Sequence, residues 1–288
     1  MCSDPLVRNV SDTALWAAEY RARENERQNP LFRDPFARRL AGARGEQIAD
    51  ALPKGRSQAW AWVTRTYLFD QFITEQVSQG AEMVVNLAAG LDARPYRMAL
   101  PRELEWIEVD LPALLDYKDE ILANEKPVCA LERVRLDLAD VPARRHLFDR
   151  LGRRRKKALV VTEGLLIYLT PDEAGSLARD LASSPGFARW VLDIVSPGLL
   201  KMLLKQWGAS LDQAGAPLKF APPEGPEFFR PFGWKPIEAR PVMKTAARVK
   251  RAPLLLRLLA KLPEAKGPPG NRPWSAVCLL ERGDRPNG

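Results

Sequence analysis

The sequence predicts an α/β fold in which a parallel β-sheet is covered by helices on both faces. From about residue 82, short apolar runs alternate with stretches of helical periodicity, as expected when strands and crossover helices follow one another. The first apolar run, at 83–88, leads into the small residues Ala88-Ala89-Gly90. Such a turn is typical of a buried strand that passes into a helix and leaves its backbone accessible.

Residues 1–80 are expected to form an N-terminal helical extension. Ser11-Asp12-Thr13 can cap a first helix, Asn29-Pro30 interrupts the pattern, and Asp34-Pro35 opens the next helix. Apolar residues at helical spacing predict a further helix from residue 59 to residue 73, with the polar Arg65 on it.

Residues 81–195 are expected to form the core of the sheet, with strands at 83–88, 105–109, 133–138, 158–162 and 189–195. Helices are predicted between them, including 111–124 and 172–182. Thr170 to Glu173 matches a capping box with proline at the first helical position. Residues 196–272 are dense in proline and glycine and predict an inserted cap of loops with a helix at 254–262. Residues 273–288 hold a last strand and a tail, and all four parts are expected to form one domain.

Composition excludes several classes of protein. The chain has 288 residues and a net charge of +8, and no apolar run is long enough to span a membrane. The beginning of the sequence has no signal-peptide pattern. The cysteines are odd in number, far apart and without a CxxC pair, so neither a metal site nor a disulfide framework is expected. Such cysteine usage predicts a cytoplasmic protein. The basic run 153–157 is interpreted as a solvated loop before a strand, because no aromatic residues interleave it as in a nucleic-acid site.

The turn at Gly90 and an acidic residue twenty positions later predict a nucleoside site. Ala88 and Gly90 are small enough for a ligand to approach the main chain, although small residues also serve close helix packing. Asp110 ends the second strand and can accept from both hydroxyls of a ribose, or cap the helix that begins at Leu111-Pro112. The full G-x-G-x-x-G fingerprint is absent, which disfavours NAD and FAD.

Three further strand ends or helix positions carry candidate residues. Asp137-Leu138 ends the third strand, where it can contact an adenine or form an ordinary turn. Glu163 follows a fully apolar strand, where a carboxylate needs a donor, water or a ligand, and Tyr168 follows it. Arg65 can pair with a ligand carboxylate, or with Asp70 or Glu75.

His146 is the only histidine in the chain. It lies among charged residues far from every expected strand end, so we predict a surface position. No serine–histidine–acid or cysteine–histidine relay can therefore be assembled. Any general base must be a carboxylate, a tyrosine, a lysine or the substrate itself.

These residues resemble the leucine carboxyl methyltransferase-like family of class I S-adenosylmethionine (SAM)-dependent O-methyltransferases, in its polyketide-associated group. The matching stretches run in order from about residue 10 to 195: Thr13-Ala14-Leu15, 29–37, 65–70, 86–97, 106–112 and 162–169. Two positions depart from the family pattern, since Ala88 stands where glycine is usual and Ala93 where threonine is usual.

The resemblance implies a class I methyltransferase fold, Rossmann-like, with a seven-stranded sheet whose last strand is antiparallel. It implies that SAM is the cofactor, that Arg65 holds its carboxylate, and that Ala88 and Gly90 line its amino-acid tail. It further implies that Asp110, beside Leu111, holds the ribose, that Asp137 and Leu138 hold the adenine, and that Glu163 lies near the tail.

Methyl transfer to an oxygen of a small molecule or natural product, most plausibly a carboxylate, is the function that these observations predict. Tyr168 is the candidate catalytic side chain, with orientation of the reactants as the main source of acceleration. Two alternatives remain: an RNA- or protein-modifying methyltransferase, suggested by the run 153–157, and a membrane- or partner-binding module with a degenerate site. The last alternative is suggested by leucines and cations that share one helix at 254–262.

Overall fold

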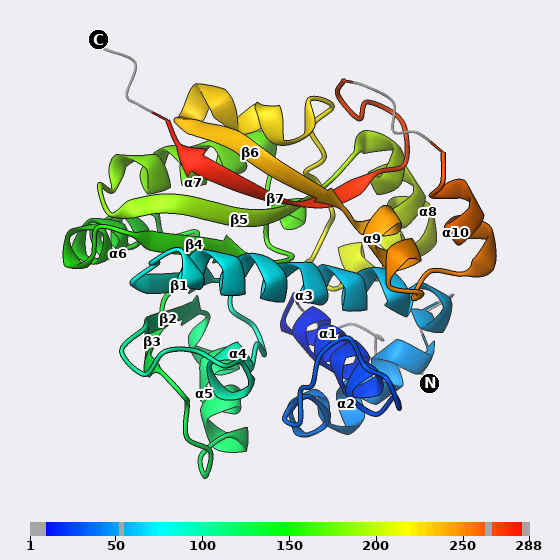
Figure 1. Cartoon of the computed structure of the whole chain (residues 1–288), viewed down its shortest axis with the longest axis horizontal. Coiled ribbons are helices and arrows are strands. Elements are labelled where there is room, and N and C mark those ends of the chain that lie inside the picture. The colour runs from blue at the N-terminus through cyan, green and yellow to red at the C-terminus, as the bar shows by residue number, and fades with distance from the viewer. Residues whose placement is uncertain (1–9, 52–54, 263–266, 284–288) are drawn as a thin grey trace.

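A seven-stranded sheet forms the centre of the computed structural model, which describes residues 10–51, 55–262 and 267–283 (Figure 1). The strand order is β3-β2-β1-β4-β5-β7-β6. Strands β1 to β5 pair in parallel, and β7 pairs antiparallel with both β5 and β6. The bounds are β1 Met83–Leu87, β2 Glu105–Asp110, β3 Ala130–Arg135, β4 Ala158–Thr162, β5 Phe187–Val195, β6 Trp234–Pro241 and β7 Ser275–Arg282.

Helices connect the strands and cover the sheet. They are α1 Val10–Asn25, α2 Ala37–Ala51, α3 Gly55–Ser78, α4 Arg94–Arg97, α5 Pro112–Ile121, α6 Val141–Arg154, α7 Pro171–Ser183, α8 Pro197–Gln213, α9 Val242–Arg248 and α10 Leu254–Leu259. Two 3₁₀ turns, η1 Leu166–Tyr168 and η2 Gly225–Phe232, complete the order. The expected capping box at Thr170 is present, and it fixes the start of α7.

Strands β1 and β4 are buried along their whole length, which explains their almost continuously apolar sequences. Val85 packs with residues of α6 and α7 on one face, while its neighbour Val84 packs with residues of α3 on the other face. Successive side chains of a strand point to opposite faces, so each apolar strand contributes to two cores. The expected α/β sheet with helices on both faces and an antiparallel last strand is therefore confirmed.

Three expectations about individual elements were wrong. The third strand lies at Ala130–Arg135, so Asp137 and Leu138 follow it at a turn and are not part of it. Ser11, Asp12 and Thr13 lie within α1 and do not precede it. Strand β6 lies in a segment that was expected to form loops. It pairs with β7 at the edge of the sheet, where a strand tolerates proline and charged residues.

The carboxyl ends of the parallel strands point toward the side of the molecule where α1, α8 and α10 lie (Figure 1). Ligands of open α/β sheets bind at this edge, where neighbouring strands diverge. No helix in the described parts of the chain combines the length and the hydropathy needed to cross a bilayer.

Candidate functional site

A cavity of about 660 Å³ lies at the carboxyl ends of the parallel strands. All of the site residues predicted from the sequence line it: Arg65, Ala88, Gly90, Asp110, Leu111, Asp137, Leu138, Glu163 and Tyr168. They come from α3, from the ends of β1, β2, β3 and β4, and from η1. The fold thus brings together side chains that are separated by up to about a hundred residues.

The turn after β1 is bonded directly to the end of β2. The amide of Gly90 donates to Oδ2 of Asp110 at 2.6 Å, and the amide of Leu111 donates to Oδ1 at 2.7 Å. Asp110 does not cap α5, because Leu111 occupies the N-cap position. Burial raises the pKa of Asp110, and the two amide donors oppose that shift. The carboxylate is therefore fixed in place at the edge of the cavity.

Two residues of this turn adopt left-handed backbone angles. Gly90 has φ 53° and Ala88 has φ 51°. Glycine adopts such angles freely, whereas the β-carbon of alanine makes them unfavourable. The methyl group of Ala88 therefore stands at a strained position that borders the cavity.

Asp137 and Leu138 border the cavity next to the ends of β2 and β3. Oδ1 of Asp137 accepts from the amide of Ala139 at 2.9 Å, so this residue also forms the ordinary turn that its sequence allows. Its side chain is exposed, while Leu138 is half-buried against the core. Both remain available to a ligand in the cavity.

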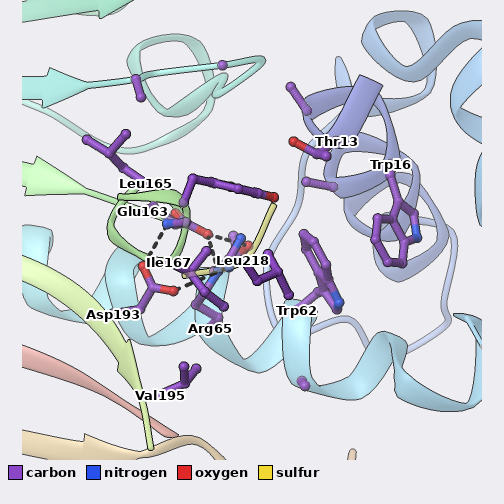
Figure 2. A pocket seen from close by; sticks show the side chains of 18 of the residues that line it. Thr13, Trp16, Trp62, Arg65, Glu163, Leu165, Ile167, Asp193, Val195 and Leu218 are labelled. Atoms are coloured by element: carbon purple, nitrogen blue, oxygen red, sulfur yellow. Dashed lines mark hydrogen bonds and ion pairs between the residues drawn. The ribbon is translucent and has the colours of Figure 1, made fainter. Parts of the chain in front are cut away.

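Arg65 lies between two carboxylates that close one side of the cavity (Figure 2). Its Nε is 3.2 Å from Oε1 of Glu163, and its Nη1 is 3.4 Å from Oδ2 of Asp193. These are long contacts for a guanidinium and a carboxylate. Asp70 and Glu75, the alternative partners expected for Arg65, bind Arg94 and Arg240 instead, so that expectation was wrong.

The two carboxylates beside Arg65 differ in their electrostatic surroundings. Burial alone would raise the pKa of Glu163, but the guanidiniums of Arg94 and Arg65 hold it below its ordinary value. Burial raises the pKa of Asp193, and Arg65 and the amide of Gly164 only partly offset this. Glu163 is thus firmly ionised, whereas Asp193 is the more readily protonated of the two.

Tyr168 borders the cavity from η1, which follows shortly after the end of β4. Burial raises the pKa of its hydroxyl, and the opposing effects of Thr13 and Arg65 are smaller. The phenol is therefore protonated at neutral pH. It can donate a hydrogen bond to a ligand but is a poor general base.

The remaining wall of the cavity is apolar and comes from the helices. Trp16 of α1 packs on Trp62 of α3 with ring centroids 4.7 Å apart and on Trp207 of α8 at 5.0 Å. Figure 2 shows Trp16 and Trp62 across the cavity from Glu163 and Asp193, with Leu218 between them and the charged residues. The cavity thus has a polar part at the strand ends and an aromatic part under the helices.

A sequence model of the leucine carboxyl methyltransferase family matches residues 14–182, more than half of the chain. The chain belongs to the leucine carboxyl methyltransferase family. The matched residues include most of α1, all of α3 and β1 to β4, and every predicted site residue. The resemblance inferred from the sequence motifs is therefore confirmed.

Proteins with similar sequences are provisionally named S-adenosyl-L-methionine-dependent methyltransferases. One from Mycobacteroides abscessus is 35% identical over 199 residues, which cover 63% of this chain and 65% of the relative. One from Streptomyces coelicolor is 34% identical over 202 residues, covering 66% of this chain and 70% of the relative. The alignment to the M. abscessus protein thus leaves about a third of its length unmatched.

Solved structures share the fold of this family member. A DUF574 family protein from Streptomyces avermitilis superposes with a TM-score of 0.60 at 11% identity, covering 94% of this chain and 97% of that protein. A methyltransferase, so named provisionally, from Thermobifida fusca superposes with a TM-score of 0.56 at 16% identity, covering 97% and 96%. These superpositions show that the fold of the chain is shared.

Arg94 also lines the cavity, although it was not among the residues expected there from the sequence. Its buried guanidinium bonds Asp70 at 2.6 Å, Asp92 at 2.8 Å and Glu163 at 2.8 Å. Burial would raise the pKa of Asp92, but Arg94 and more distant cations lower it to about 2. The sequence places Arg94 four residues after Gly90, between Ala93 and Pro95, but it does not indicate which carboxylates the fold brings to it.

The basic run 153–157 is mostly neutralised by neighbouring carboxylates. Arg153 pairs with Asp149 at 2.9 Å, Arg154 pairs with Glu105 at 2.5 Å, and Arg155 also contacts Glu105. The run lies at the end of α6 and in the turn before β4, as the solvated-loop interpretation expects. It offers few free cations to a nucleic acid.

The sequence also led to expectations about His146 and about metal-binding side chains. His146 is exposed on α6 and does not line the cavity, which confirms its predicted surface position. Within residues 10–51, 55–262 and 267–283, no three histidine, cysteine or acidic side chains are placed so that they could share a metal ion.

Proposed function

We propose that this chain is a SAM-dependent methyltransferase that methylates an oxygen of a small apolar molecule, a carboxylate in particular. The observation that carries the proposal is the bonded pair Gly90–Asp110 at the crevice where the strands diverge. The provisional names of the relatives support the same cofactor. All nine predicted residues border this one cavity, which supports a common ligand.

The polar part of the cavity fits the cofactor group by group. Each oxygen of Asp110 accepts one amide and keeps a second lone pair, so the carboxylate can still accept from ribose hydroxyls. Arg65 has long contacts to its present partners, so it can turn to a carboxylate of the amino-acid tail. Leu138 offers an apolar surface to an adenine, beside the exposed acceptor of Asp137.

Glu163 is suited to hold the positively charged end of that tail. It is ionised because two guanidiniums lower its pKa, and it borders the cavity beside Arg65. The glycine turn leaves the main chain open to the ligand between Ala88 and Gly90. We therefore assign cofactor binding to Arg65, Ala88, Gly90, Asp110, Leu111, Asp137, Leu138 and Glu163.

When bound, SAM supplies a methyl group on a positively charged sulfur, which an acceptor oxygen can attack in line. A carboxylate is already ionised at neutral pH, so the protein needs no general base to activate it. The cavity offers no histidine, and Tyr168 is protonated, so it can orient an acceptor by donating a hydrogen bond. Well-oriented reactants account for roughly 7–11 kcal/mol of the barrier in favourable cases.

The acceptor is expected to be apolar because of the wall that it faces. Trp16, Trp62 and Trp207 come together under α1, α3 and α8, with Leu203 and Leu218 beside them on the same cavity. Burying apolar area against such a wall gives about 25 cal/mol per Å². Modification of RNA is not favoured, since the three arginines of the run 153–157 are paired with carboxylates. Two buried free thiols, Cys129 and Cys278, support the expected cytoplasmic location.

The experiment that tests the proposal uses SAM with an isotopically labelled methyl group. The protein is incubated with aromatic and long-chain carboxylic acids, and with the corresponding primary alcohols and amides as controls. Mass spectrometry is expected to find labelled methyl esters of one class of acids and no product from the matched amides. If the protein binds SAM but labels neither an acid nor an alcohol, oxygen methylation is wrong; if it does not bind SAM, the cofactor assignment is wrong.

A further inference from the structure

Helix α10 and the turn after it expose a continuous stripe of leucines. Leu254, Leu255, Leu258, Leu259 and Leu262 are 45–75% exposed. Their spacing places them on one side of the helix, and α10 stands at the edge of the molecule, away from the sheet (Figure 1). Exposed apolar side chains gathered in one patch mark an interaction site more often than single ones do.

A second exposed apolar pair lies on α8, which borders the same cavity as α10. Met202 is 55% exposed and Leu204 is 40% exposed. Met202 also lines the cavity, as do Pro253 and Leu256 at the start of α10. The leucine stripe and this pair, called here the α8–α10 surface, therefore lie on two helices that both border the cavity.

The charges around the α8–α10 surface are almost all positive. The segment 242–262 contains six cations and no acidic residue, namely Lys244, Arg248, Lys250, Arg251, Arg257 and Lys261. On α8, Lys201 and Lys205 flank the exposed pair, and Asp212 near its end is the single acid. Lys201, Lys205, Arg257 and Lys261 form no ion pair with any residue that the structure describes.

We propose that the α8–α10 surface docks on a bilayer that contains anionic lipid. An apolar stripe with cations around it matches the two layers of such a surface, because the leucines reach the acyl region while the cations meet the headgroups. A second protein copy would have to bring the same cations against each other, since a two-fold contact pairs identical surfaces. Charge complementarity therefore favours the anionic bilayer.

Docking would bring α8 and the start of α10, which border the cavity through Met202, Pro253 and Leu256, close to the lipid. An apolar acceptor could then pass from the bilayer to the Trp16–Trp62–Trp207 wall without crossing water. This consequence rests on the proposed function, whereas the docking itself rests only on the exposed residues and their charges.

The test is sedimentation of the full chain with vesicles of phosphatidylcholine, with and without phosphatidylglycerol. Binding is expected only with phosphatidylglycerol, and it should weaken as salt screens the cations. The double substitution Leu254→Ser with Leu258→Ser should weaken binding at least about tenfold. Lys201→Gln and Lys261→Gln should each weaken it about fivefold. Ile237→Ser, which changes a 42% exposed residue of β6 outside the surface, should leave it unchanged.

Several outcomes would overturn the proposal. It is wrong if the chain does not sediment with phosphatidylglycerol vesicles at low salt, or if the leucine and Ile237 variants bind equally. A dimer seen by analytical ultracentrifugation that the double leucine variant abolishes, without vesicle binding, would identify a second copy as the occupant. Circular dichroism melting curves of the variants should match the parent, because the substituted side chains are exposed. None of these measurements requires methyl transfer, so failure here is distinct from failure of the proposed function.

Discussion

The amide of Gly90 and the carboxylate of Asp110 form a 2.6 Å hydrogen bond that joins the turn after β1 to the end of β2. This bond fixes the carboxylate that is proposed to bind a ribose. Its donor belongs to the main-chain turn that is proposed to contact the cofactor tail. The two halves of the proposed cofactor site are thereby positioned by each other. A change at Asp110 should affect both of them.

Replacing Asp110 with alanine should weaken SAM binding at least tenfold, a loss of about 1.4 kcal/mol. The substitution removes the proposed ribose acceptor and frees the Gly90 amide from its partner. Isothermal titration calorimetry measures the change. Asp116→Ala is the matched control, because Asp116 is an exposed acid on the neighbouring helix α5 that pairs with Arg135. Equal affinities for both variants would remove Asp110 from the site.

Replacing Ala88 with glycine should stabilise the protein, although most substitutions by glycine destabilise. Ala88 has φ 51°, and left-handed angles cost a residue with a β-carbon about 1–2 kcal/mol relative to glycine. The extra freedom of glycine in the unfolded chain offsets about 0.4–1 kcal/mol of this. A net gain of roughly 0.5–1 kcal/mol in the free energy of unfolding is therefore expected from urea titration.

Ala89→Gly provides the comparison for Ala88, because Ala89 is buried and is not among the non-glycine residues with positive φ. This variant should lose about 0.5–1 kcal/mol. If both glycine variants lose the same stability, the strain at Ala88 is not real. Calorimetry with SAM on the Ala88 variant would also show whether the methyl group restricts the cofactor pocket.

The central strands could be predicted from the sequence because burial on both faces makes them continuous apolar runs. Strand β6 could not be predicted from the sequence. It contains Pro236 and Pro241 and several charged residues, and it pairs only with β7 at the edge of the sheet. Edge strands tolerate proline and charge, so their sequences differ little from loops.

The candidate site follows the same division. Asp110 and Glu163 were predictable because Asp110 is the last residue of β2 and Glu163 directly follows the apolar strand β4, both at the ligand edge. Asp193 lies inside the apolar run of β5, where the sequence does not indicate which residue reaches that edge. Arg94 was missed because its role depends on three carboxylates brought together from α3, from the turn after β1 and from the end of β4.

Replacing Arg94 with glutamine should destabilise the protein by about 3–5 kcal/mol at neutral pH, because it leaves buried carboxylates without their counter-ion. In the parent, Arg94 lowers the pKa of Asp92 to about 2 and also lowers that of Glu163. A lowered folded-state pKa gives stability that is present above the unfolded-state pKa, about 4, and is lost as pH falls toward 2. In the variant, only the weaker effects of the other cations, such as Lys118 on Asp92 and Arg65 on Glu163, oppose burial. Both pKa values should therefore rise, and protonation of these carboxylates should reduce the loss of stability.

The stability gap between the parent and the Arg94 variant should therefore shrink as pH falls from about 7 to about 4. Urea unfolding at several pH values in this range measures it. Arg135→Gln, which removes an exposed guanidinium paired with Asp116 and Asp119, should show a small and nearly constant gap. A gap for Arg94→Gln that does not change with pH would contradict the proposed ionisation of the cluster.

Replacing Tyr168 with phenylalanine should distinguish orientation from base catalysis. Burial raises the pKa of the phenol, so the parent carries a neutral donor at this position and no phenolate. With a carboxylate acceptor, we expect kcat to fall by about tenfold or less, the loss of one hydrogen bond, and to stay independent of pH from about 6 to about 9. Calorimetry should find SAM affinity changed by less than about threefold, because the donor would face the acceptor rather than the cofactor. A parent rate that rises with pH and becomes pH-independent in the phenylalanine variant would instead make Tyr168 the base, and the acceptor a phenol or an alcohol.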